Sequence, residues 1–264
     1  MNDASFSWDA GGRVAIAGDW HGSIIWVQSA IPRLHRRLPD VSTVLHLGDF
    51  GIFRERHGSG FLAPVDFWCQ SASISRVLVT PGNHEDWGEL ASRFAEQPGE
   101  AVQLSRAVWV FPRGFRFVLG GHSWLSFSGA ASVDREFRTE GVEWWAEETP
   151  TELDVEQAIA SGPVDVMLTH ETVDGGTREV DSILATNPMG WPPAALAYSA
   201  ESRRRLTQLW NAVRPTVLAH GHLHVKGEIK LDDGRRVYSL GSNGTEGNLA
   251  LINTRTLEWE WLTD

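Results

Sequence analysis

Five short runs of apolar, often β-branched residues recur along the 264-residue chain, and a glycine, aspartate, asparagine or histidine follows each of them. The runs are residues 14–17, 43–47, 77–80, 164–168 and 216–219. Runs of this length that are apolar on both faces are typical of strands buried in a sheet that helices cover. The sequence therefore predicts a sheet with most of its strands inside the molecule.

Helix-like segments separate these runs. The predicted helices are residues 24–38, 66–75, 87–96 and 199–213. Alternation of strands and helices predicts an α/β fold. Residues 108–129 and 228–261 depart from it, because both read as successive strands, with the turn signals "DDG" and "SNG" in the second. We therefore expect mixed strand directions and two sheets.

Residues 173–198, "VDGGTREVDSILATNPMGWPPAALAY", are rich in glycine and proline and lack clear periodicity. The sequence predicts a long loop there. A loop of this length in a compact domain is often functional. Because it follows His170, we expect it to shape the entrance to a substrate site.

The composition sets broad limits. Cys69 is the only cysteine, so no intramolecular disulfide can form. The N-terminus lacks a basic and apolar signal segment, and no stretch approaches the about 18 apolar residues of a membrane span. We expect one domain over residues 1–264, in a soluble cytoplasmic protein that does not bind a membrane. Its oligomeric state is not readable from the sequence.

The formal net charge is −11, from 34 acidic and 23 basic residues. A sequence-independent grip on nucleic acid requires a basic face that neutralises phosphates. The acidic balance therefore argues against a nucleic acid polymer as partner. An acidic protein can still bind a phosphate group if metal ions supply the positive charge.

Residues that bind metals collect where the five apolar runs end. They are Asp19 and His21, then Asp49, then Asn83, His84 and Glu85, then His170, then His222 and His224. In α/β sheets, ligands bind outside the carboxyl ends of the strands. We therefore expect these side chains to meet at one place.

Imidazole and carboxylate together suit divalent transition metals such as Zn, Fe, Mn or Ni. A pair of ions about 3.5–4 Å apart needs a bridging ligand, and Asp49 is the natural bridge. Residues two apart project the same way from an extended chain, which would bring His222 and His224 to one cluster. His220 comes before the glycine, so we interpret it as a supporting residue rather than a ligand.

The motifs "GDWHG", "GDFG", "GNHE", "THE" and "GHLH", in this order, resemble the five motifs of the calcineurin-like metallophosphoesterase superfamily. The resemblance implies a four-layer α/β/β/α sandwich of two mixed sheets flanked by helices. It implies one metal ion on Asp19, His21, Asp49 and His224, and a second on Asp49, Asn83, His170 and His222. It implies that His84 contacts the substrate phosphate or the leaving group. We expect two divalent transition metal ions, with Mn favoured.

Two stretches of the sequence indicate which branch of this superfamily the chain resembles. Residues 128–154, "SGAASVDREFRTEGVEWWAEETPTELD", look like a segment of small bacterial and phage members. Protein phosphatases of the superfamily carry Asp-Arg-Gly after the second motif, whereas this chain has Ile52 where that aspartate would fall. The resemblance therefore supports the superfamily more than a protein phosphatase.

Hydrolysis of a phosphoester needs a nucleophile, which a metal-bridging hydroxide would supply. It also needs the negative charge of the phosphoryl group to be neutralised, which two metal ions would do. His84 would protonate the leaving oxygen, and Glu85 is a candidate to orient it. The candidate substrate-binding residues are Arg54, Arg135, Arg138 and Trp191. One arginine guanidinium can donate two hydrogen bonds to two oxygens of a phosphate group, and a tryptophan ring can stack on a base or another aromatic leaving group.

We therefore expect a dinuclear phosphoesterase whose catalytic residues are His84 and Asp49 and whose substrate is a small phosphoester or nucleotide. Whether that substrate is a monoester or a diester stays open. A serine/threonine-type protein phosphatase is the first alternative. A nuclease is disfavoured by the charge, and a non-enzymatic metal-bearing scaffold that binds a protein partner is disfavoured because no motif ligand is missing.

Overall fold

The computed structural model describes residues 12–52 and 60–263, and within them the chain forms two mixed sheets. The first has the strand order β13-β12-β1-β2-β3-β5-β4, with β1 (Arg13–Ala17), β2 (Thr43–His46), β3 (Arg76–Val79), β4 (Val102–Gln103), β5 (Val108–Val110), β12 (Leu249–Asn253) and β13 (Trp259–Trp261). The second has the order β10-β11-β9-β8-β7-β6, with β6 (Phe115–Leu119), β7 (His122–Phe127), β8 (Val166–Thr169), β9 (Val217–His220), β10 (Gly227–Lys230) and β11 (Arg236–Ser239).

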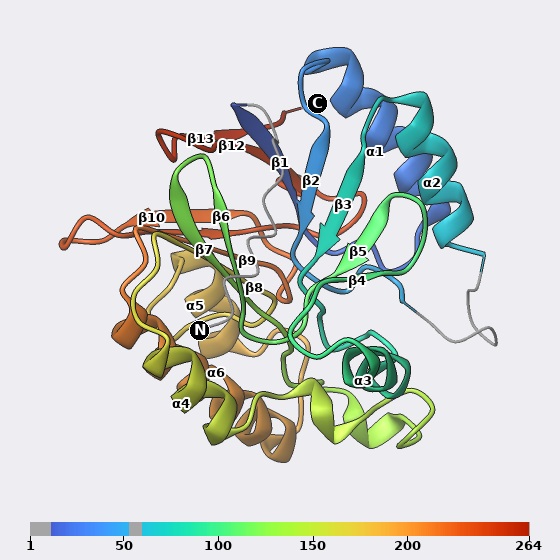
Figure 1. The fold of residues 1–264 in the computed structure, drawn as a ribbon. Coiled ribbons are helices and arrows are strands. Elements are labelled where there is room, and N and C mark those ends of the chain that lie inside the picture. The colour runs from blue at the N-terminus through green and yellow to red at the C-terminus, as the bar shows by residue number, and fades with distance from the viewer. Residues whose placement is uncertain (1–11, 53–59, 264) are drawn as a thin grey trace.

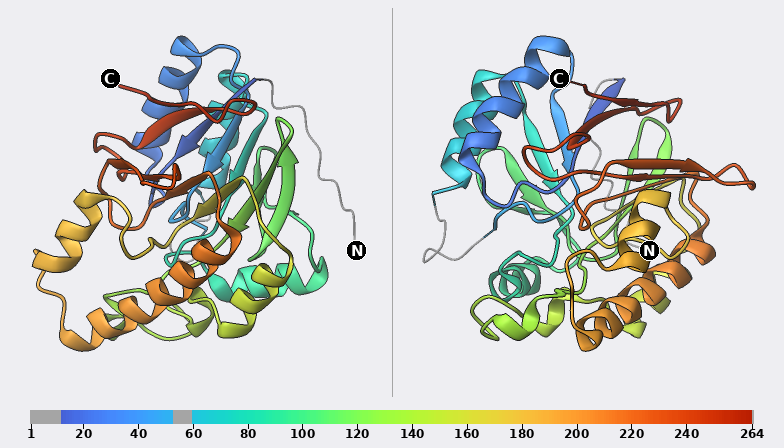
Figure 2. Two further views of the ribbon diagram at one scale, coloured as in Figure 1. Left: turned by 90° about the vertical axis from the view of Figure 1, so that its left-hand side faces the viewer. Right: turned by 180° about the vertical axis from the view of Figure 1, so that it is seen from behind.

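Helices cover the outer face of each sheet (Figures 1 and 2). Helices α1 (Ile24–Arg37) and α2 (Leu62–Ser71) lie on the first sheet, and α4 (Glu152–Ala160) and α6 (Pro193–Val213) lie on the second. Helix α3 (Trp87–Glu96) follows β3, and α5 (Arg178–Thr186) follows β8 and packs beside β10. This is the α/β/β/α arrangement that the sequence predicted.

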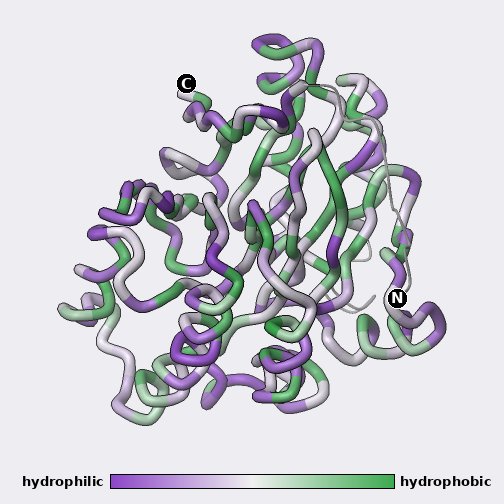
Figure 3. Tube along the Cα trace, turned by 60° about the vertical axis from the view of Figure 1, so that its left-hand side comes forward, coloured by the Kyte–Doolittle hydropathy of each residue, from purple (hydrophilic) through white to green (hydrophobic). Residues whose placement is uncertain are grey.

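Three apolar clusters separate the four layers, because successive strand residues point to opposite faces. In β2, Val44 faces the helices α1 and α2, whereas Leu45 belongs to the cluster between the sheets. In β8, Leu168 faces the first sheet and Met167 packs toward α4 and α6. Figure 3 shows the result, with hydrophobic strands at the centre and hydrophilic residues frequent on the outer helices.

The strands that carry the candidate ligands end at the same side of the molecule. β1, β2 and β3 are parallel neighbours, and β8 and β9 are parallel neighbours in the second sheet. Two helices begin directly after site segments. Ser23 Oγ accepts the Trp26 N–H at 3.2 Å to start α1, and Asp86 Oδ1 accepts the Glu89 N–H at 2.9 Å to start α3. Such N-caps stabilise a helix start by about 1 kcal/mol.

The prediction of a structureless loop over residues 173–198 was wrong, because α5 and the first turn of α6 lie within it. Gly175 and Gly176 precede α5, and the other glycine and the prolines of that stretch stand between the two helices or at the first position of α6, where proline fits without losing a hydrogen bond. Helix α4 was absent from the predicted set. None of the helices in the described ranges is long and apolar enough to cross a membrane.

Candidate metal centre and active site

The candidate ligands follow the carboxyl ends of five strands. Asp19 and His21 follow β1, Asp49 follows β2, Asn83 follows β3, His170 directly follows β8, and His222 and His224 follow β9. The structure therefore brings the seven residues to the shared edge of the two sheets. They divide into two groups that meet at Asp49.

The first group comprises Asp19, His21, Asp49 and His224, whose nearest ligand atoms all lie within 4.8 Å of one another. His224 Nε2 is 3.0 Å from Asp19 Oδ2, and His21 Nε2 is 3.4 Å from Asp49 Oδ2. Two carboxylates and two imidazoles at this spacing could hold one transition metal ion. Asp19 and Asp49 are buried, so their charges lie in a medium that weakly screens them.

The second group lies on the other side of the Asp49 carboxylate. His170 Nε2 is 3.0 Å from Asn83 Oδ1 and 3.3 Å from Asp49 Oδ1. The ring of His222 lies 5.1 Å from the ring of His170, between centroids. Asp49 thus presents Oδ2 to the first group and Oδ1 to the second, which is the arrangement a bridging carboxylate needs.

Two further observations fit a metal at this place. His222 Nε2 is buried and has no hydrogen-bond partner in the structure, which is costly for a polar atom unless a ligand satisfies it. Gly82 and Gly221 press against the carboxylates, because a Cβ at either would collide with Asp49 Oδ1 or Asp19 Oδ1. The donor set and its cradle are therefore suited to divalent metal ions.

The electrostatics of the two groups also favour positive charge. Burial lowers the pKa of His170, but the negative charges of Asp49 and Asp19 outweigh it and raise the pKa to about 10. For His21, burial is likewise outweighed by the hydrogen bond to Asp49 and the charge of that carboxylate, and the pKa rises to about 8. The buried aspartates create a potential that a cation would satisfy.

Ligands two apart do not share one face of an extended chain, so that prediction was wrong. His21, Asp49, His222 and His224 have left-handed backbone conformations, with φ of 47°, 48°, 73° and 55°. β9 ends at His220, so the following backbone turns, and His222 and His224 enter different groups. Non-glycine residues rarely adopt positive φ, and such strain is concentrated at functional sites.

His220 is fully buried at the end of β9, where Nδ1 is 3.0 Å from the Gly221 carbonyl oxygen and Nε2 is 3.3 Å from Thr172 Oγ1. Both ring nitrogens are thus engaged by neighbouring protein groups. This placement agrees with the supporting role expected for it.

Glu85 does not contact His84, contrary to the proposed orienting role. Its buried carboxylate accepts the backbone N–H groups of Asp49 and Gly51 at 3.1 Å each, and also that of Gly82. Burial, reinforced by the charge of Asp49, raises the pKa of Glu85 to about 7. Glu85 therefore holds together the loops that follow β2 and β3, which carry Asp49 and Asn83.

A buried network that the sequence did not reveal orients Asn83. Asn83 Nδ2 donates to Ser132 Oγ at 3.0 Å, and the N–H and Oγ of Ser132 donate to the two oxygens of Glu148 at 2.7 Å each. Tyr198 OH donates to Glu148 at 3.1 Å. With the amide nitrogen so engaged, Asn83 Oδ1 points to His170. Burial raises the pKa of Glu148 to about 7.

We expect Ser132→Ala to weaken binding of one metal ion by about 10- to 100-fold, because loss of a group that orients a metal ligand has effects of this size. The variant removes the acceptor that fixes the Asn83 amide. Titration of the metal-free protein with Mn²⁺ measures the change. Ser161→Ala, at the exposed end of α4, is the matched control. Equal affinities in both variants would show that the network does not support the site.

His84 lies beside the bridging carboxylate. Its backbone N–H donates to Asp49 Oδ1 at 2.9 Å, and its Nε2 is 3.8 Å from Asp49 Oδ2. Arg138 Nη2 is 2.8 and 2.9 Å from the two ring nitrogens of His84 and donates to Asp134 Oδ2 at 2.7 Å. Arg138 thus joins His84 to Asp134, and about one third of the His84 side chain is exposed.

The other two candidate arginines differ from Arg138. The guanidinium of Arg135 lies 3.7 Å from the centroid of the Tyr198 ring and 5.8 Å from that of Trp144. This stacking engages Arg135 away from the metal ligands, and it does not line the cavity described next. Arg54 lies outside the described residues.

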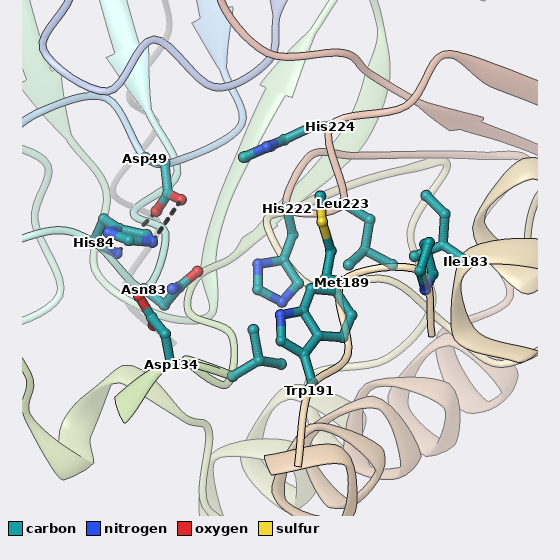
Figure 4. A pocket seen from close by; sticks show the side chains of 12 residues that line it. Asp49, Asn83, His84, Asp134, Ile183, Met189, Trp191, His222, Leu223 and His224 are labelled. Atoms are coloured by element: carbon teal, nitrogen blue, oxygen red, sulfur yellow. Dashed lines mark hydrogen bonds and ion pairs between the residues drawn. The ribbon is translucent and has the colours of Figure 1, made fainter. Parts of the chain in front are cut away.

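A cavity of about 290 Å³ opens beside the ligands (Figure 4). Its polar lining is Asp49, Asn83, His84, Asp134, His222 and His224. Its apolar lining is Val133, Ile183, Pro188, Met189, Trp191 and Leu223. Figure 4 shows Trp191 and Met189 across the cavity from Asp49 and His84. Trp191, a predicted substrate-binding residue, therefore borders this space, and so does Asp134.

The comparisons with known proteins agree with this architecture. The family model "Calcineurin-like phosphoesterase" matches residues 12–226, which is most of the chain. The chain therefore belongs to the calcineurin-like phosphoesterase family, and membership implies hydrolysis of phosphoesters. Among curated proteins, no match to the chain is found.

Solved structures show the same fold at low identity. TT1561 of Thermus thermophilus is 12% identical, with a TM-score of 0.55, 94% of this chain and 96% of that chain covered. A dimetal phosphatase from Danio rerio is 15% identical, with a TM-score of 0.53 and coverage of 91% and 92%. GAP50, the anchor in the inner membrane complex of Plasmodium, is 11% identical, with a TM-score of 0.52 and coverage of 95% and 88%.

Proposed function

We propose that the protein is a dinuclear metal-dependent phosphoesterase that hydrolyses a small phosphoester. The observation that carries the proposal is the position of Asp49, whose two oxygens face two separate ligand groups. The first ion would be held by Asp19, His21, Asp49 and His224. The second would be held by Asp49, Asn83, His170 and His222.

Two divalent ions bound there would neutralise the phosphoryl oxygens and lower the pKa of a water molecule so that it can attack phosphorus. His84 borders the same cavity and would protonate the oxygen of the departing group. Arg138 would position the His84 ring by donating an N–H to one of the two ring nitrogens, which leaves the other to carry the proton. Manganese is the ion we favour, with iron, zinc and nickel accepted by the same donors.

The structure around Ile52 does not favour a serine/threonine-type protein phosphatase. Ile52 is buried and its carbonyl oxygen accepts the Asp86 N–H at 2.7 Å. It therefore supplies packing and a backbone hydrogen bond where that class has a charged aspartate. The small cavity also suits a small substrate rather than a phosphoprotein surface.

A paired assay tests the proposal. Purified protein loaded in turn with Mn²⁺, Ni²⁺, Zn²⁺ or Mg²⁺ is given p-nitrophenyl phosphate or bis-p-nitrophenyl phosphate. We expect metal-dependent release of nitrophenol from at least one, and the faster ester identifies a monoesterase or a diesterase. Two bound ions without turnover of either ester would favour the scaffold alternative instead.

A further inference from the structure

We propose that the site selects phosphoesters whose substituent is uncharged and aromatic, and that Trp191 is the residue that stacks on it. This inference rests on the proposed function, because it assigns a role in substrate binding to the end of the cavity that the reacting phosphoryl group does not occupy. Apolar side chains from α5 and from the segment between α5 and α6 form that end.

The cavity has two chemically distinct sides. One side contains the candidate metal ligands and His84, whereas the other is formed by Ile183, Pro188, Met189 and Trp191 (Figure 4). Met189 is 73% exposed, and an unpaired apolar side chain at the mouth of a site gains free energy when a ligand covers it. A phosphoryl group bound at the polar side would direct its substituent against this apolar wall.

Trp191 is anchored in place rather than left on a free loop. The side chain of Asn187 donates to the Trp191 carbonyl oxygen and accepts the Trp191 N–H, each at 2.9 Å. Asn187 ends α5 in a left-handed conformation with φ of 45°, which asparagine tolerates better than most residues. Because these bonds fix the backbone of Trp191, less conformational entropy is lost when a ligand stacks on the ring than on a free loop.

The charges around the cavity disfavour further anionic groups. No lysine or arginine is found among the described residues that line it, and Asp134 is the only carboxylate in that lining other than the candidate ligand Asp49. Arg138, which contacts both Asp134 and His84, is already engaged with them. Among the described residues of this lining, a second carboxylate or phosphate on the substrate would therefore find no cationic partner to offset its lost solvation.

The cavity volume suits a small substituent. About 290 Å³ is near the lower limit of pockets that bind small molecules, about 300–1,000 Å³. One or two fused rings fit this description better than a peptide or an oligonucleotide.

Calorimetry with non-hydrolysable phosphonates tests the inference. Metal-loaded protein is titrated with methylphosphonate, 2-naphthylphosphonate and a 2-naphthylphosphonate that carries a carboxylate on its second ring. We expect 2-naphthylphosphonate to bind at least about tenfold more tightly than methylphosphonate, because one stacked aromatic pair together with apolar burial provides enough binding free energy for that difference. The carboxylated ligand should lose most of this advantage.

Variants assign the preference to Trp191. Trp191→Ala should reduce the naphthyl-to-methyl affinity ratio by about fivefold or more, and Trp191→Phe should retain most of it. Met189→Asp, at the exposed rim, should also reduce the ratio and does not depend on folding of the tryptophan variant. Phe67→Ala, an exposed aromatic truncation on α2, is the matched control and should leave the ratio unchanged.

The outcomes separate this inference from the proposed function. A naphthyl-to-methyl affinity ratio near one, in a protein that hydrolyses p-nitrophenyl esters, overturns the aromatic subsite but not the proposed function. A ratio that neither Trp191→Ala nor Met189→Asp changes has the same meaning. The expected ratios in a protein that hydrolyses no ester support the aromatic subsite and overturn the proposed activity.

Discussion

Asp49→Ala is expected to lower phosphoester hydrolysis on the order of 10³-fold and to leave fewer than two bound metal ions per chain. Asp49 Oδ2 faces His21 and Asp49 Oδ1 faces His170, so the variant removes a ligand from both groups at once. Metal ions contribute several kcal/mol to stabilisation of the transition state, and each 1.36 kcal/mol is worth tenfold in rate. Steady-state rates and elemental analysis measure the two effects.

The matched control is Asp40→Ala, which removes an exposed aspartate paired with Arg13 outside the site. It should leave both the rate and the metal content unchanged. Circular dichroism and thermal melting establish that the two variants are folded. Two retained ions and an undiminished rate in folded Asp49→Ala would show that this carboxylate is not the bridge.

His84→Ala is expected to lower the rate by about 10²- to 10⁴-fold, the usual contribution of a general acid, while both metal ions stay bound. The rate should fall without loss of metal because His84 lines the cavity and contacts Arg138 and Asp49 but belongs to neither ligand group. The loss should be smaller for a p-nitrophenyl ester than for an alkyl ester, since nitrophenolate departs without a proton.

His122→Ala is the control for this variant. Its ring contacts the Arg255 carbonyl oxygen and Asp165 at the far end of β7, and its loss should leave the rate unchanged. An equal loss for both leaving groups in His84→Ala would contradict proton donation and assign His84 to binding of the phosphoryl group.

The sequence predicted the elements that bury a continuous apolar face. The predicted strand over 77–80 is β3 (Arg76–Val79), and the predicted helix 87–96 is α3. Strong periodicity and clear caps determine such elements locally. Helix α5 buries only Val180 and is followed by Pro188, Gly190 and Pro192, so its helical signal was weaker than the turn signal around it.

The candidate ligands could be found from the sequence because all seven follow the ends of five predicted strands, so local patterns placed them at one edge. The residues that support them could not. Glu148 reaches Asn83 only through Ser132, and neither the pairing nor its burial has a local signature. The backbone of the ligands also resisted prediction, because the left-handed φ of His222 and His224 has no local sequence signal, and the His222 N–H donates to the carboxylate of Asp19, at 3.2 Å, which lies far away in the sequence.

The proposed activity requires that this chain hold two metal ions and depend on them for hydrolysis. The most direct test is elemental analysis of the manganese-loaded protein, with the rate on the better p-nitrophenyl ester measured before and after chelation. We predict two ions per chain, loss of the rate on chelation, and recovery when Mn²⁺ is restored. A saturating content of one ion or none would contradict a dinuclear site. Hydrolysis that survives complete removal of metal would contradict a metal-dependent reaction.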